Sequence, residues 1–120
     1  MLAIHVENLG DLTVVECKGR IVRSESVLEL RDVVMAQAGA RIITLDLSEV
    51  EALGGGGLGM LVFLQHWAST RGIELKLFSP SRPVMTELER SASALKLEIA
   101  SLHEMMDILA HSDAQYTLAA

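Results

Sequence analysis

Residues 42–47 (IITLDL) are apolar or β-branched at every position but one, and this segment constrains the fold more than any other part of the chain. A strand with one face in water alternates apolar and polar residues, whereas a strand covered on both faces is apolar almost throughout. The segment therefore predicts a buried strand in a sheet with helices packed beside it, which is the arrangement of an α/β domain.

The N-terminal part of the chain predicts a hairpin followed by a helix. Apolar and polar residues alternate from residue 2, residues 8–11 have turn composition, and residues 12–18 have the pattern of a second strand. Ser26 and Glu29 match a capping box, in which each side chain accepts a hydrogen bond from the other residue's backbone N–H. We therefore expect a helix that begins near Ser26 and ends at Gly39.

The C-terminal half alternates between helices and short strands. Pro83 is typical of a first helical turn, and Ser101 with Glu104 forms a second capping box. The predicted elements are a helix from Leu58 to Gly72, a strand over residues 73–78, a helix from Pro83 towards Ser91, a strand over residues 97–99 and a helix after Ser101. Residues 111–120 have neither a clear period nor a stop signal, so we expect a flexible tail after a domain that spans residues 1–110.

Composition limits the classes of function. A chain of 120 residues is about one domain long, and its hydrophobic fraction of 50% is enough for a full core. The net charge is −6 and no Lys or Arg follows Lys96, which argues against binding of nucleic acid or of an anionic membrane. Cys17 is the single cysteine and has no internal disulfide partner, so a reduced, cytoplasmic setting is expected.

The longest uncharged stretch, residues 52–70, is long enough to span a bilayer. Five glycines and several polar residues interrupt it, and a glycine-rich loop before a buried helix explains it better. Residues 1–10 lack the basic start of a secretory signal. We therefore expect a soluble protein with no direct membrane insertion.

Five of the nine glycines lie within residues 54–59 (GGGGLG). Ordering consecutive glycines costs conformational entropy, so the site needs unusual dihedrals or the close approach of another backbone. Gly54, Gly56 and Gly59 match the dinucleotide-binding pattern G-x-G-x-x-G, with Glu74 as the acidic residue 20 positions later. The match is weak, because residues 48–53 separate the strand from the first glycine and Glu74 precedes its strand.

Three other interpretations of the glycine run are a P-loop, a docking loop and a loop crowded by its own domain. A P-loop needs a lysine after the last glycine, and Met60 stands there instead. A docking loop at a helix N-terminus would use free backbone N–H groups and the lack of side chains to let another surface come close. A loop crowded by its own domain would also need glycines, and the residues alone favour neither of the last two.

The sequence contains no catalytic or metal-binding motif that we recognise. His5, His66, His103 and His111 show no ligand spacing such as H-E-x-x-H, and the nucleophile pattern G-x-S-x-G is absent. We therefore expect no catalytic residue, no metal site and no cofactor.

Residues 42–61 also carry a family resemblance. This segment resembles the central part of STAS domains: it has an aliphatic strand ending in D-L-S, a hydrophobic connector, and G-L-G before an apolar helix. STAS domains occur as bacterial anti-sigma-factor antagonists and in sulfate transporters. The match covers roughly residues 2–110, and it includes Gly19 and residues 72–73, 79–81 and 88–97. The resemblance implies a single α/β domain with a mixed sheet of four or five strands and about four helices packed beside it.

The resemblance further implies a non-catalytic protein-interaction module. Family members bind a GHKL-type kinase that is also an anti-sigma factor, and this kinase phosphorylates the first serine of D-S-S-G, so that the phosphate charge releases the partner. The family's Asp falls on Gly54, the phosphorylated serine on Gly55, the second serine on Gly56, and a supporting polar position on Val22. The resemblance therefore implies that this loop has lost its phosphorylation site.

We expect a bacterial protein that acts in partner-switching regulation of transcription, with a GHKL-type anti-sigma factor or kinase as its partner; a homodimer is compatible with this role. The alternative is a small STAS subunit that regulates the ATPase component of a membrane transporter, and a third hypothesis, nucleotide sensing, has no supporting motif. Natural divergence and deliberate replacement would both produce the glycine run. The expected partner-binding residues are Leu53, Gly54, Gly55, Gly56, Gly57, Leu58, Gly59, Arg20 and Arg23.

Overall fold

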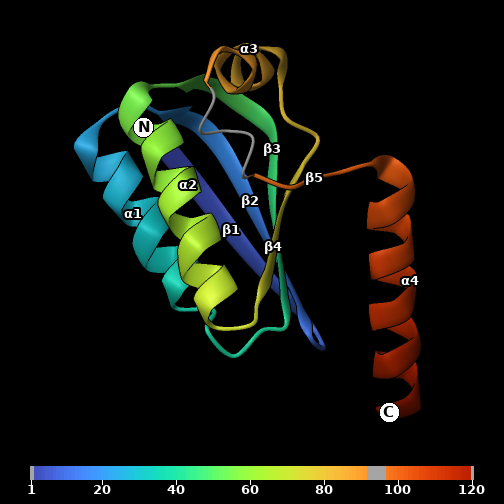
Figure 1. Ribbon diagram of the computed structural model, residues 1–120. Coiled ribbons are helices and arrows are strands. Elements are labelled where there is room, and N and C mark those ends of the chain that lie inside the picture. The colour runs from blue at the N-terminus through green and yellow to red at the C-terminus, as the bar shows by residue number, and fades with distance from the viewer. Residues whose placement is uncertain (1, 92–96, 120) are drawn as a thin grey trace.

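The computed structural model describes residues 2–91 and 97–119, and it contains one mixed five-stranded sheet with four helices (Figure 1). The strands lie in the order β1-β2-β3-β4-β5; β1 is antiparallel to β2, and every other neighbouring pair is parallel. The predicted α/β fold with a mixed sheet is thus confirmed. The elements are β1 (Leu2–Leu9), β2 (Leu12–Ile21), α1 (Ser24–Met35), β3 (Ile42–Leu53), α2 (Gly55–Thr70), β4 (Glu74–Phe78), α3 (Arg82–Arg90), β5 (Ile99–Ala100) and α4 (Leu102–Ala119).

The core lies between one face of the sheet and the helices α1 and α2, which run side by side (Figure 1). Alternate residues of a strand point to opposite faces, so Val15, Leu45 and Leu77, which are register neighbours, share the helix-covered face. All three are at most 1% exposed. Helix α3 packs across one end of the sheet, and α4 lies on the side opposite α1 and α2 (Figure 1).

The N-terminal hairpin forms as predicted, with Leu9 paired to Leu12 across the two-residue loop Gly10-Asp11. Gly10 has φ of +65°, a left-handed conformation that glycine adopts without steric cost. The strand β3 is longer than predicted, because residues 48–53 continue it as far as Leu53. Buried Val50 and Leu53 keep these residues on the sheet, and two register shifts in the β2–β3 pairing accommodate them.

The two predicted capping boxes have opposite outcomes. The Ser26–Glu29 box is wrong: α1 begins at Ser24 after Arg23, no side chain caps it, and Ser26 is a buried residue inside the helix. The Val27 N–H donates to the Arg23 carbonyl oxygen at 3.0 Å, so the helix has already begun when the chain reaches Ser26. The Ser101–Glu104 box is confirmed, since the Glu104 N–H donates to Ser101 Oγ at 3.1 Å and the Ser101 N–H donates to Glu104 Oε1 at 3.3 Å.

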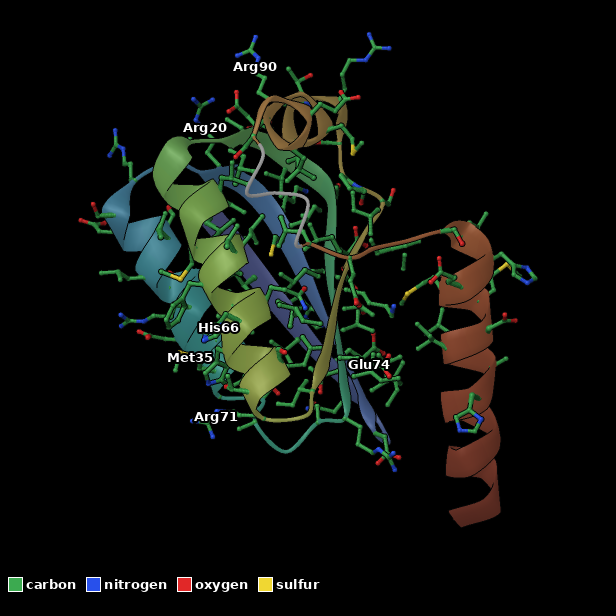
Figure 2. All side chains as sticks on the ribbon, in the orientation of Figure 1. Arg20, Met35, His66, Arg71, Glu74 and Arg90 are labelled. Carbon is green, nitrogen blue, oxygen red and sulfur yellow. The ribbon has the colours of Figure 1, made fainter. Side chains whose placement is uncertain are left out.

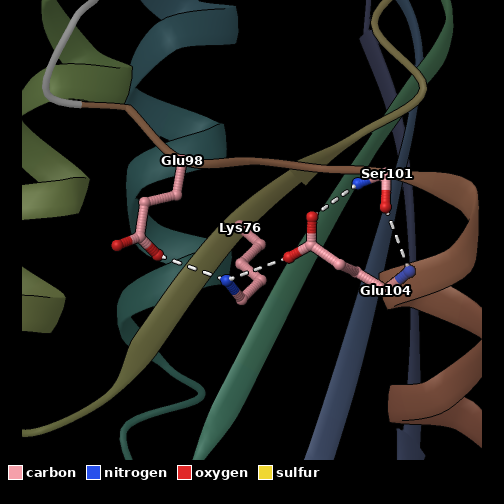
Figure 3. A network of polar contacts seen from close by, with 4 residues as sticks. All are labelled: Lys76, Glu98, Ser101 and Glu104. Atoms are coloured by element: carbon pink, nitrogen blue, oxygen red, sulfur yellow. Dashed lines mark hydrogen bonds and ion pairs between the residues drawn. The ribbon is translucent and has the colours of Figure 1, made fainter.

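The capping box before α4 is also tied to the sheet (Figure 3). Lys76 of β4 lies 3.4 Å from a carboxylate oxygen of Glu98 and 3.9 Å from one of Glu104, and only 18% of the Lys76 side chain is exposed. Met105, which follows directly, is 4% exposed. These contacts hold the first turn of α4 against the side of the sheet that α1 and α2 leave uncovered.

The segment predicted as a tail is helical in the structure, because α4 continues through it to Ala119. The boundary at residue 110 stays a prediction. Part of the loop predicted before the last strand, residues 92–96, lies outside the described residues. Within the described part of the chain, no helix combines the length and apolar character needed to cross a membrane.

Cys17 provides a direct test of the core. The thiol lies in β2 with 2% of the residue exposed, and its burial, with a smaller contribution from the Asp46 carboxylate, raises its pKa to about 12. The thiol therefore loses its proton at a lower pH in the unfolded chain than in the folded chain. Its contribution to the free energy of unfolding is complete below about pH 8.5 and is lost as the pH rises towards 12. At pH 8 we expect a thiol reagent to label the native protein at least about 100-fold more slowly than the urea-unfolded chain. Equal labelling rates would contradict the buried position of Cys17.

Candidate docking surface

The glycine run forms the N-cap and the first turn and a half of α2, so the predicted loop is a helix start. Gly54 is the N-cap, with φ of −86° and ψ of 174°, and its N–H donates to the Ile21 carbonyl oxygen at 3.0 Å. The Leu58 N–H bonds to the Gly54 carbonyl oxygen, which closes the first helical turn. No side chain caps the helix, which leaves the N–H groups of residues 55–57 without an intrahelical acceptor.

The glycines differ in what surrounds them, and the interpretation of a loop crowded by its own domain applies to only part of the run. A methyl group built on Gly57 would lie 2.5 Å from the Ile21 carbonyl oxygen and 2.7 Å from Leu53 Cδ1, so this position is crowded by its own domain. Gly55, Gly56 and Gly59 would have no atom within 4 Å of such a group. Steric crowding therefore explains Gly57 and does not explain the three exposed glycines.

A shallow apolar groove adjoins this bare helix start. It has a volume of about 280 Å³ and lies between the first turns of α1 and α2. Two large apolar side chains border it in exposed positions, Val22 at 39% and Leu28 at 43%. Gly54 lies beside Val22, since a methyl group on Gly54 would be 3.5 Å from the Val22 Cα atom. The residues that line the groove are Val22, Ser24, Val27, Leu28 and Gly56.

Positive charge borders the same end of the molecule. Figure 2 shows Arg20 near the start of α2, at the end of the sheet where α3 carries Arg90. Arg20 and Arg23 are both exposed, and neither forms an ion pair with another described residue. In a chain with a net charge of −6, this end combines two unpaired guanidinium groups with the positive end of a helix dipole.

The structure brings the predicted partner-binding residues to one end of the domain, but they do not all reach the surface. Leu53, Gly57 and Leu58 are buried and support the helix start from below. Gly55, Gly56, Gly59 and the two arginines are exposed. Sequence reasoning missed Leu28, because a leucine on an amphipathic helix is normally assigned to the core.

The strand before the glycine run does not end at residue 47, as the sequence pattern predicted. Residues 48–53 are strand, so β3 leads directly into Gly54 and the helix as a dinucleotide site requires. The position of Glu74 still argues against a dinucleotide site. Glu74 is the first residue of β4 and lies at the opposite end of the sheet from Arg20 (Figure 2). The acidic residue of such a site belongs at the end of the strand nearest the glycines.

Sequence reasoning also missed a group of three side chains on the hairpin that could together ligate a metal ion. His5, Glu7 and Glu16 are exposed, and their ligating atoms all lie within 4.8 Å of one another. The sequence shows His5 and Glu7 two residues apart within one strand. Glu16 joins them only because β1 and β2 pair in the observed register, and the spacing of residues along the chain does not reveal that register.

A family model described as STAS domain matches residues 3–108. The chain therefore belongs to the STAS domain family. No curated protein sequence matches it.

Three solved structures show the same fold. The anti-sigma factor antagonist SpoIIAA in its unphosphorylated form has a TM-score of 0.73 at 15% identity, over 91% of this chain and 97% of that chain. An anti-sigma factor antagonist from Mycobacterium paratuberculosis has a TM-score of 0.75 at 17% identity, over 91% of this chain and 94% of that chain. SLC26A9 has a TM-score of 0.69 at 14% identity, over 94% of this chain but only 21% of that chain.

Proposed function

We propose that this protein is a non-catalytic interaction module of the anti-sigma-factor-antagonist type, whose partner docks on the bare start of α2. We define the docking surface as Arg20, Val22, Arg23, Leu28, Gly55, Gly56 and Gly59. The partner proposed is a GHKL-type anti-sigma factor or kinase, in a partner-switching system that regulates transcription. Both anti-sigma factor antagonists reported above align over more than nine-tenths of their own length, which supports this class of function.

The observation that carries the proposal is the absence of any steric reason for three glycines in a helix. Glycine in a helix costs about 0.5–1 kcal/mol relative to alanine, and the full cost applies at interior positions. Gly55, Gly56 and Gly59 would accept a methyl group without contact. These glycines lower the stability of the helix although alanine would fit. Their lack of side chains instead lets the backbone of a partner come close to the helix start.

The charge of the docking surface defines the chemistry of the partner. Free N–H groups at the helix start and two unpaired arginines attract carboxylates, and the groove beside Val22 and Leu28 accepts an apolar side chain. An acidic segment with one or two large apolar residues satisfies both requirements. Since Gly54, Gly55 and Gly56 have no hydroxyl group, phosphorylation at these positions cannot release the partner.

Replacing Gly55 by Asp tests the docking surface. The position is exposed, nothing lies within 4 Å of a new Cβ atom, and an acid in the first turn suits the helix dipole, so the variant folds. The new carboxylate occupies the free N–H groups and repels an acidic partner. We expect the affinity for the captured partner to fall at least about tenfold, equivalent to 1.4 kcal/mol.

The partner is first captured from an extract of the native host, identified by mass spectrometry, and titrated by calorimetry. Gly55→Ala separates added bulk from added charge, and Gly39→Asp adds the same charge at an open glycine away from the docking surface. Unchanged affinity for Gly55→Asp would show that the partner binds elsewhere.

The match to SLC26A9 favours one alternative, because it shows this fold within a much longer chain. In that role the protein would be a small STAS subunit that regulates the ATPase component of a membrane transporter. Capture of an ATPase subunit in place of a GHKL-type protein would replace the primary proposal with this one.

A further inference from the structure

The side of the sheet opposite α1 and α2 carries a compact set of nitrogen and oxygen donors on the N-terminal hairpin. His5 of β1 stands directly opposite Glu16 of β2 in the antiparallel register, and Glu7 follows two residues later on the same face. The ligating atoms of the three side chains lie within 4.8 Å of one another. Because the backbone register fixes all three positions, only side-chain rotations are needed to bring the donors onto one ion.

The charges around this group favour a bound cation. Glu7 and Glu16 form no ion pair with any described residue. The two lysines on the same side of the sheet are engaged elsewhere, Lys18 with Glu49 and Lys76 with Glu98 and Glu104. Asp46 is the β3 neighbour of Glu16 in the register and adds a further negative charge. The two carboxylates of the group therefore repel each other with no described cation between them.

The donor set selects the class of ion. One imidazole nitrogen with two carboxylates is a combination that Zn²⁺ accepts, whereas Mg²⁺ and Ca²⁺ prefer oxygen ligands throughout. Three protein ligands leave the fourth tetrahedral position for water or an outside ligand. We propose that His5, Glu7 and Glu16 bind one Zn²⁺ ion, which joins the edge strand β1 to β2.

Titration of the tag-free full chain with ZnCl₂, followed by calorimetry, tests this site. We expect saturable binding of one Zn²⁺ per chain, and we expect an excess of Mg²⁺ not to displace it. His5→Asn and Glu16→Gln should each lower the affinity at least about tenfold, since each removes one of three protein ligands. Both residues are exposed, so these variants keep the fold.

The matched control is His103→Asn on α4, because His103 is also exposed and lies 3.4 Å from the Asp107 carboxylate. This variant should bind Zn²⁺ as the unmodified chain does. Replacement of Zn²⁺ by Co²⁺ adds a second readout, in which the visible absorption of tetrahedral Co²⁺ appears in the unmodified chain and is absent from His5→Asn. The proposal is overturned if binding does not saturate, if His5→Asn binds as tightly as the unmodified chain, or if Mg²⁺ competes equally.

Discussion

Gly57→Ala is expected to destabilise the protein by about 3 kcal/mol, near the upper end of the range for overpacking a well-packed site. The new methyl group would lie 2.5 Å from the Ile21 carbonyl oxygen, and that oxygen already accepts the Gly54 N–H bond that positions α2. The carbonyl group cannot move away without loss of this bond. Urea unfolding followed by the fluorescence of Trp67, the single tryptophan, measures the change in free energy.

Gly56→Ala is the matched control, because it adds the same methyl group to the same helical turn. Nothing lies within 4 Å of that group, so the loss of backbone freedom in the unfolded chain should stabilise the protein by about 0.5–1 kcal/mol. The two variants therefore differ in sign. A Gly57→Ala protein as stable as the unmodified one would show that α2 can move away from β2, and would contradict the packing described here.

Leu64→Ala is expected to cost about 3 kcal/mol, within the range for deleting a fully buried leucine. Leu64 lies on α2 with 0% of its surface exposed, and it belongs to the cluster between the helices and the sheet. Its truncation removes apolar contacts and leaves a cavity that the surrounding strands cannot close. Urea unfolding monitored by circular dichroism measures the loss without relying on nearby Trp67.

Phe63→Ala is the neighbouring control, because Phe63 is 46% exposed on the same helix. A larger side chain is removed, yet we expect a loss below about 1 kcal/mol, since much of it already contacts water. If both variants lost the same stability, the burial pattern of α2 would be wrong.

The sequence was sufficient to predict the α/β class and the order of the elements. Residues 42–47 indicated a strand covered on both faces, and the alternation of strand and helix patterns gave the rest. The Ser101–Glu104 cap was also predictable, because both partners lie within one turn of an exposed helix start. Each of these features depends on residues that are close together in the sequence.

The features that failed depended on distant contacts. Ser26 has the spacing of a cap, but α1 begins at Ser24 and Ser26 is buried within its first turn. Residues 48–53 continue β3 because β2 pairs with them through two register shifts. The glycine run contains two kinds of glycine: Ile21 and Leu53 crowd Gly57, whereas Gly55, Gly56 and Gly59 face open space.

The strand order of the sheet is the same as the order of the strands in the chain, and this has a consequence for synthesis. Each strand that leaves the ribosome meets the exposed edge of the strand made just before it, so no segment has to thread between strands already paired. The hairpin of β1 and β2 needs only a two-residue loop and forms first, on the microsecond timescale. A nascent chain that has released residues up to Phe78 therefore already contains the four strands β1 to β4, whereas Glu98 and Glu104, the ion-pair partners of Lys76, have not yet been released.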